Sequence, residues 1–93
     1  MFEWDEAKSA RSREERGFDF RYTSRIFDGD VIEKNDIRQD YGELRMIAIG
    51  EVDGRIMVVA YTWRDGRRRI ISARPAKRRE RHDYRRAQLE RDP

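Results

Sequence analysis

The sequence has 93 residues, of which 37% are hydrophobic and 44% are charged, so it predicts one small domain with a thin core. Cysteine is absent, which excludes disulfide scaffolds, thiolate metal sites and thiol nucleophiles. The sequence contains neither an apolar run long enough to span a bilayer nor a secretory leader, so we expect a soluble cytoplasmic protein without membrane contact. The expected organisation is a single domain over residues 1–93 whose core is completed by a partner or a second copy.

The formal net charge of +3 hides a strong separation of charge along the chain. The stretch from Arg64 to Arg91 contains twelve basic and four acidic residues, whereas the residues before Arg64 include ten basic and fourteen acidic ones. A basic final third favours an anionic partner such as a nucleic acid. The competing interpretation is that these charges form a solvated helix face, as charge runs usually do.

Two helices are predicted in the first third of the chain. Asp5 is suited to the N-cap of the first helix, and Gly17 to the position with positive φ that follows its end. Asp19 is the predicted N-cap of the second helix, in which Phe20 begins an apolar stripe with helical spacing. The short apolar stretch 2–4 is either a brief strand or an anchor. The predicted helices span residues 6–16 and 18–27.

The middle of the sequence predicts a sheet. Asp-Gly pairs at 53–54 and 65–66 separate apolar runs and are a strong signal for tight hairpins, because type I′ turns need positive φ. The run between the two pairs is apolar on both faces, so we expect helices on one side of it and further packing on the other. The expected strands, the first of them weak, are 31–37, 44–50, 55–63 and 67–74.

The last predicted strand leads directly into a C-terminal helix. Pro75 suits the first turn of a helix, where its missing amide hydrogen costs nothing. Residues 76–89 carry a thin apolar stripe and many charges, which predicts a helix on the surface. The order of elements predicts an α+β fold with two N-terminal helices, an antiparallel meander of about four strands, and a C-terminal helix.

Four motifs extend from the start of the chain to about residue 84: Phe2-Glu3-Trp4-Asp5-x-x-Lys8, Gly17-x-x-Phe20, Arg45-Met46-Ile47-Ala48-Ile49-Gly50, and Arg69-Ile70-Ile71-Ser72-Ala73-Arg74-x-Ala76-x-x-Arg79-Glu80-Arg81-x-x-Tyr84. Together they resemble the BrnT family, the ribonuclease halves of BrnT/BrnA type II toxin–antitoxin systems. The resemblance implies a RelE-like fold and RNA cleavage without a metal ion or other cofactor. It also implies neutralisation by a small BrnA-like antitoxin with a DNA-binding segment, for which we expect a 2:2 hetero-oligomer.

One segment departs from the family pattern. The family usually has Asn-x-x-Lys-His-Gly before the second helix, where this chain has Ser12-Arg13-Glu14-Glu15-Arg16-Gly17. Glu15 and Arg16 therefore take the places of the lysine and the histidine, and an arginine stays protonated at any working pH. This difference supports an alternative function, in which a catalytically weakened module binds RNA or a partner and acts mainly as antitoxin partner and operon co-repressor.

The basic block contains the candidate active site. RNA cleavage without a metal needs a base for the 2′-hydroxyl, cations for the phosphorane and an acid for the leaving oxygen. The resemblance implies that clustered arginines and lysines carry most of this chemistry. Glu80 is the best placed carboxylate, but cationic neighbours would keep it ionised, which favours an orienting role over that of an efficient base. The predicted catalytic residues are Arg45, Arg69, Arg74, Lys77, Glu80 and Arg81.

Further residues are expected to contact RNA through its phosphates or by stacking on its bases. They are Arg16, Tyr61, Trp63, Arg64, Arg78 and Tyr84. His82, the only histidine, is interpreted as a surface residue, and one histidine with scattered carboxylates does not predict a metal site. The predicted function is therefore that of an endoribonuclease toxin acting on RNA, with mRNA as the expected substrate. A general DNA-binding domain is disfavoured because the sequence has no recognisable groove-reading element.

Overall fold

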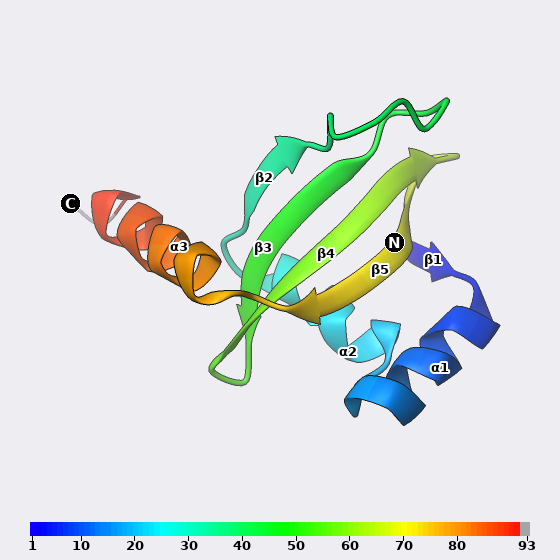
Figure 1. Cartoon of the computed structure of the whole chain (residues 1–93), viewed down its shortest axis with the longest axis horizontal. Helices are drawn as coiled ribbons and strands as arrows, with labels where there is room; N and C mark the ends of the chain where they lie inside the picture. Colours follow the sequence, from blue (N-terminus) through cyan, green and yellow to red (C-terminus); the bar gives the residue numbers. More distant parts are fainter. Residues whose placement is uncertain (92–93) are drawn as a thin grey trace.

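A computed structural model of the chain describes residues 1–91, and residues 92–93, at the end of the predicted domain, lie outside the described residues. The described part forms a mixed sheet of five strands in the order β1-β5-β4-β3-β2, with helices packed on it (Figure 1). No helix within it is long and apolar enough to cross a membrane. The elements are β1 (Phe2–Trp4), α1 (Glu6–Arg16), α2 (Phe20–Ser24), the 3-10 helix η1 (Arg25–Asp28), β2 (Ile32–Asn35), β3 (Met46–Val52), β4 (Arg55–Arg64), β5 (Arg67–Pro75) and α3 (Arg78–Arg91).

The α+β class and the antiparallel meander are confirmed. Strands β3, β4 and β5 pair in sequence order, and both hairpins turn through an Asp-Gly pair. The φ angles are 51° at Asp53 and 78° at Gly54 in the first turn, and 52° at Asp65 and 75° at Gly66 in the second. Positive φ at both central residues is the type I′ requirement, and it matches the twist of the flanking strands.

The number of strands differs from the prediction of about four. Residues 2–4 form β1, which pairs in parallel with β5 at the edge of the sheet. Phe2 and Trp4 pack against the core under the helices, so this strand buries aromatic surface as well as completing the edge. At the other edge, the predicted strand 31–37 shortens to β2, which ends at Asn35. The amide of Asp36 still donates to the carbonyl of Arg45 at 2.8 Å, while its carboxylate binds Arg38.

The predicted helix caps are confirmed. The Asp5 carboxylate accepts hydrogen bonds from the amides of the first turn, including that of Ala7 at 2.9 Å. Asp19 accepts from the amide of Tyr22 at 2.9 Å. Gly17 follows α1 with a φ of 87°, in the left-handed region that lets the chain turn back toward α2.

The second helix is shorter than the predicted 18–27. The α-helix α2 ends at Ser24, and the chain continues as η1. The hydroxyls of Thr23 and Ser24 donate to the carbonyls of Phe20 at 3.2 Å and Arg21 at 2.7 Å. Such bonds from side chain to backbone compete with the α-helical pattern, which explains the change to a tighter helix.

The main core lies between the sheet and the helices α1, α2 and η1. Ile26 of η1 packs so closely on β3 that a Cβ atom at Gly50 would lie 2.7 Å from the Ile26 Cβ. Helix α1 joins this layer through polar contacts, since Ser9 Oγ accepts from the amide of Phe20 at 3.0 Å. The buried members of this core are Phe18, Phe20, Ile26, Ala48, Val52, Met57, Val59, Tyr61, Ile70 and Ala73.

The opposite face of the sheet is covered over part of its area. Helix α3 projects from one edge of the sheet (Figure 1). Helices α1 and α2 lie on the face that carries the main core. Tyr84 of α3 packs with Ile56 and Val58 at one end of this face. Beyond that contact, Ala60 is half-buried and Ser72 is exposed. We call this side of β3, β4 and β5, away from α1 and α2, the open face.

Candidate active site on the open face

A β-bulge in β5 brings two predicted catalytic arginines to the open face. The register between β4 and β5 shifts between Ala60 and Tyr61, so β5 contains one extra residue, Ile71. Because side chains alternate along a strand, Arg69 and Arg74 would face opposite sides of the sheet without this extra residue. The bulge therefore sets both guanidinium groups on one face.

Arg74 and Glu80 form an ion pair with two hydrogen bonds in this site. Nη1 and Nη2 of Arg74 donate to Oε1 and Oε2 of Glu80 at 2.7 and 2.8 Å. Glu80 Oε1 also accepts from the backbone amide of Lys77 at 2.8 Å, as in a helix capping box. The hydrogen bonds from Arg74 and then from Lys77 lower the pKa of Glu80 to about 2, and the same pair raises the pKa of Arg74. Glu80 is thus ionised at neutral pH and fixes the plane of the guanidinium group.

Arg38, which the sequence did not single out, is also oriented by a carboxylate. The Asp36 carboxylate, with its side chain 1% exposed, accepts from Nε and Nη2 of Arg38 at 2.8 Å each. It also accepts from the Tyr41 hydroxyl at 3.1 Å. The hydrogen bonds from Arg38 hold the pKa of Asp36 well below its usual range. The charge of Arg38 opposes, to a small extent, the rise in the pKa of Arg74 that Glu80 causes.

Three further arginines of the open face lie close to carboxylates. Nη1 of Arg69 lies 2.9 Å from Oε2 of Glu3 on the neighbouring β1. At the end of the open face away from α3, Glu43 lies 3.5 Å from Arg45 and 3.7 Å from Arg64. The Arg45 guanidinium carbon lies 3.9 Å from the centre of the Tyr41 ring. The Nε atom of Arg45 is buried without a hydrogen bond to any described residue. Arg45 and Arg64 therefore share one site, separate from the Arg74–Glu80 pair.

Three predicted residues on α3 have different surroundings. Tyr84 is 2% exposed, its hydroxyl donates to the carbonyl of Asp30 at 2.9 Å, and burial raises its pKa. This tyrosine anchors α3 to the body of the protein and is not free to stack on a base. Arg81 donates from Nη1 to the carbonyl of Ala76 at 2.7 Å, and Arg78 is exposed at the start of the helix.

Tyr61, Trp63 and Arg16 lie on the side of the sheet away from the open face. Tyr61 is 1% exposed and donates its hydroxyl to Oε1 of Glu33 at 2.8 Å. Trp63 packs edge-on against Tyr61 with ring centres 5.8 Å apart, and the guanidinium of Arg68 lies 4.7 Å from the Trp63 ring. Arg16 is the exposed last residue of α1. The structure thus does not bring these residues together with Arg69 and Arg74.

Potential metal ligands are scattered. Within residues 1–91, no group of three or more histidine, aspartate or glutamate side chains is placed to hold a metal ion. His82 is exposed on α3, as predicted. The charged groups gathered on the open face are arginines and the carboxylates that orient them.

The fold and the site define a small α+β protein with an exposed arginine cluster suited to binding phosphates. The sequence matches the family described as "Ribonuclease toxin, BrnT, of type II toxin-antitoxin system" over residues 4–80, and the chain belongs to this family. The predicted relationship to BrnT is therefore confirmed. No curated protein matches the chain. Membership of the family implies an RNA target and an antitoxin partner.

Proposed function

We propose that the chain is the toxin of a type II toxin–antitoxin system, a RelE-like endoribonuclease that cleaves mRNA in the cytoplasm and so arrests translation. The supporting observation is that Arg69 and Arg74 lie on one exposed sheet face in a chain of a ribonuclease toxin family. Arginines bind phosphates through paired hydrogen bonds and stabilise the charge that develops on a phosphorane. On this proposal the reaction needs no metal ion or other cofactor.

In this proposal Arg74 contacts the scissile phosphate. Its bonds to Glu80 and to the carbonyl of Pro75 use three of the five guanidinium hydrogens, which leaves two donors for the substrate. Glu80 acts as a positioning residue, because a carboxylate with a pKa of about 2 is a poor base at neutral pH. Arg69 and Lys77 add positive charge on either side of Arg74. Arg45 and Arg81 add positive charge at the two ends of the open face.

The role of Arg74 is tested by comparing Arg74→Ala with Arg74→Lys in cleavage of a labelled RNA by purified protein. Loss of a group that stabilises the transition state is expected to slow cleavage by about 10²- to 10³-fold in the alanine variant. Lysine keeps the charge but not the paired geometry, so the cleavage rate of Arg74→Lys should lie between those of the wild type and Arg74→Ala. Equal rates in all three proteins would contradict the proposal.

Independence from metals is tested on the wild-type protein. Cleavage should continue in an excess of EDTA, because arginine side chains rather than a bound cation supply the positive charge. Cleavage that stops in EDTA and returns with added Mg²⁺ would show that this part of the proposal is wrong.

A second candidate function follows from Arg16, which occupies the family's histidine position. The chain could act mainly as antitoxin partner and co-repressor, with weak cleavage of its own. The variant Arg16→His separates the two functions, because histidine titrates near neutral pH and arginine does not. A large gain in cleavage supports the weakened module, whereas an unchanged rate supports the active toxin.

The proposed partner is a BrnA-like antitoxin with a DNA-binding segment, in a 2:2 complex. The basic open face favours an acidic or amphipathic antitoxin segment that blocks the path of the RNA. Expression of the chain alone should stop growth and accelerate RNA decay, and co-expression of the neighbouring small gene product should restore both. The mass of the purified complex in solution then tests the 2:2 stoichiometry.

A further inference from the structure

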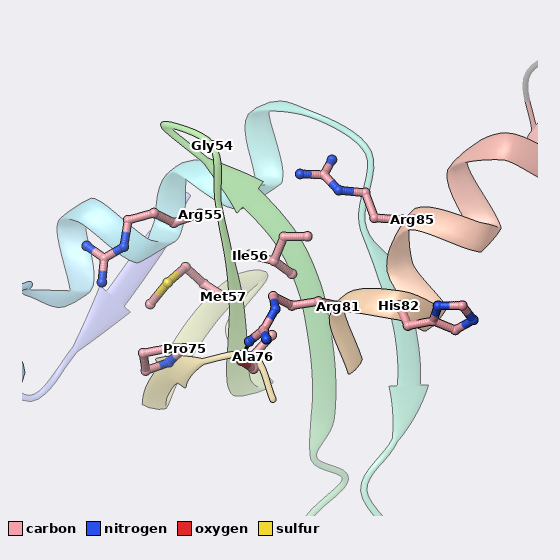
Figure 2. Close-up of a pocket in the computed structure, with 9 residues that line it drawn as sticks. All are labelled: Gly54, Arg55, Ile56, Met57, Pro75, Ala76, Arg81, His82 and Arg85. Atoms are coloured by element: carbon pink, nitrogen blue, oxygen red, sulfur yellow. Dashed lines mark hydrogen bonds between the residues drawn. The ribbon is translucent and has the colours of Figure 1, made fainter. Parts of the chain in front are cut away.

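We propose that a basic pocket beside the junction of β5 and α3 binds one nucleotide of the RNA, next to the scissile phosphate. This inference rests on the proposed function and adds a substrate subsite to it. The pocket, which we call the junction pocket, has a volume of about 490 Å³. It is lined by Gly54, Arg55, Ile56, Met57, Pro75, Ala76, Arg81, His82 and Arg85 (Figure 2).

The charge of the junction pocket selects an anionic ligand. Three arginines line it, and among the described residues no acidic side chain does. Arg81 is held by the neutral carbonyl of Ala76, and Arg55 packs over the ring of Phe18 at 5.5 Å, so neither contact neutralises a charge. Arg85 alone of the three has a carboxylate partner in the described structure, Glu51 at 2.8 Å. An excess of positive charge therefore remains for a phosphate.

The size and floor of the junction pocket fit a nucleotide better than a bare phosphate. Its volume falls in the range of about 300–1,000 Å³ that is usual for small-molecule sites. Ile56, Pro75 and Ala76 belong to the lining of the pocket, and in Figure 2 Ile56 and Ala76 lie near the side chain of Arg81. These apolar side chains give a base a surface to pack on, while the arginines bind the phosphate.

The junction pocket adjoins the Arg74–Glu80 pair through the chain itself. Pro75 and Ala76 line the pocket and directly follow Arg74, and Arg81 directly follows Glu80. A single RNA strand that crosses this short connection would therefore meet Arg74 with one phosphate and the pocket with a neighbouring nucleotide. Phosphate groups repeat along a strand, so adjacent cationic sites are what such a ligand requires.

Arg55 lines both the junction pocket and a second hollow, and so indicates where the bound RNA strand continues. In Figure 2 its side chain points away from Arg81. It also lines a second hollow of about 360 Å³, whose other charged lining residues are Arg13 and Asp19, the latter an N-cap that bonds the amide of Tyr22. The two hollows thus share one arginine, and the second lies beside the segment that contains Arg16. The RNA path inferred from these hollows runs from α3 toward the end of α1.

The test measures binding apart from cleavage, by fluorescence anisotropy with a labelled single-stranded oligonucleotide whose riboses are 2′-O-methylated and so resist cleavage. Arg85→Ala and Arg55→Ala should each weaken binding about three- to tenfold. Each should also reduce the slope of log affinity against log salt by about 0.7 for every phosphate of the single strand that the variant no longer neutralises. Glu51→Gln should strengthen binding, because it releases Arg85 from its carboxylate partner.

The matched control is Arg86→Ala, one residue further along α3. Arg86 is 72% exposed, pairs with Glu90 at 3.6 Å and does not line the junction pocket, so its replacement should change affinity little. The inference is overturned if Arg85→Ala and Arg55→Ala bind the oligonucleotide as the wild type does. It is also overturned if Arg85→Ala and Arg55→Ala weaken binding of the antitoxin but not of the oligonucleotide. The same holds if Glu51→Gln changes the affinity for the oligonucleotide no more than Arg86→Ala does. A wild type that binds the oligonucleotide at this pocket but cleaves no RNA would refute the proposed function and leave the subsite standing.

Discussion

At the scale of single residues, the candidate site is organised by carboxylates that orient arginines. Glu80 holds Arg74, Asp36 holds Arg38 and Glu3 holds Arg69, each at a distance of 2.7–2.9 Å. A guanidinium whose geometry is fixed before the substrate arrives loses less conformational entropy on binding. The carboxylates thus contribute to recognition without taking part in proton transfer.

The pair formed by Glu80 predicts a specific dependence of stability on pH. Its folded pKa of about 2 lies below the ordinary value of 4.5, so its contribution is complete above about pH 4.5 and is lost as the pH falls toward 2. Glu80→Gln removes this charge with little change of shape. The variant should lose on the order of 1–2 kcal/mol at pH 7, after allowance for solvent screening, and almost nothing near pH 2. Denaturant unfolding of both proteins at several pH values measures the difference, and a difference that does not depend on pH would contradict this role.

Residues whose roles are local could be predicted from the sequence. Asp5 and Asp19 cap helices because their carboxylates reach amides only two or three residues away. Arg38 and Tyr61 could not be placed in this way. Arg38 lies in the loop between β2 and β3, which has no regular pattern, and Tyr61 bonds to Glu33 from a strand that is not its direct neighbour.

At the scale of elements, strand pairing decides which charges meet. The sequence predicted the hairpins of the meander from their Asp-Gly turns, but periodicity alone places Arg69 and Arg74 on opposite faces. The bulge at Ile71 reverses that outcome and keeps Ile70 and Ala73 together in the core. Since a bulge depends on how two strands pair, a single strand's sequence does not reveal it.

The packing of η1 on β3 predicts that Gly50 tolerates no side chain. A Cβ atom there would lie 2.7 Å from Ile26 Cβ and 3.0 Å from a methyl group of Val31. Gly50→Ala should therefore destabilise the protein by about 1–3 kcal/mol through overpacking. In thermal unfolding this corresponds to a fall in Tm of about 4–8 °C per kcal/mol for a domain of this size.

The control for Gly50 is Gly29→Ala, in the loop that follows η1. A Cβ atom at Gly29 would have no described atom within 4 Å, and its φ of −119° is accessible to alanine. This variant should unfold within a degree or two of the wild type, because surface substitutions without new contacts change stability little. Equal melting temperatures for the two alanine variants would show that η1 moves aside at little cost.

At the scale of the whole molecule, the two faces of the sheet have different tasks. The face under α1, α2 and η1 contains the main core, including Tyr61 and Ile70. The open face contains Arg69 and Arg74 and ends at α3, where Tyr84 provides the anchor. The basic balance of the final third of the sequence predicted an anionic partner, but the sequence did not reveal that Tyr61 and Trp63 lie on the face opposite Arg69 and Arg74.

This division predicts that Tyr61→Phe lowers stability without affecting RNA cleavage. Tyr61 lies in the main core, and the variant loses its hydrogen bond to Glu33 while keeping the aromatic ring. Loss of one hydrogen bond to a charged acceptor should cost about 1–2 kcal/mol, visible as a lower midpoint in denaturant unfolding. At a temperature where both proteins are folded, cleavage per folded molecule should equal that of the wild type. A tenfold loss of cleavage at unchanged stability would instead place Tyr61 in the RNA site, and the two faces would then act together on the substrate.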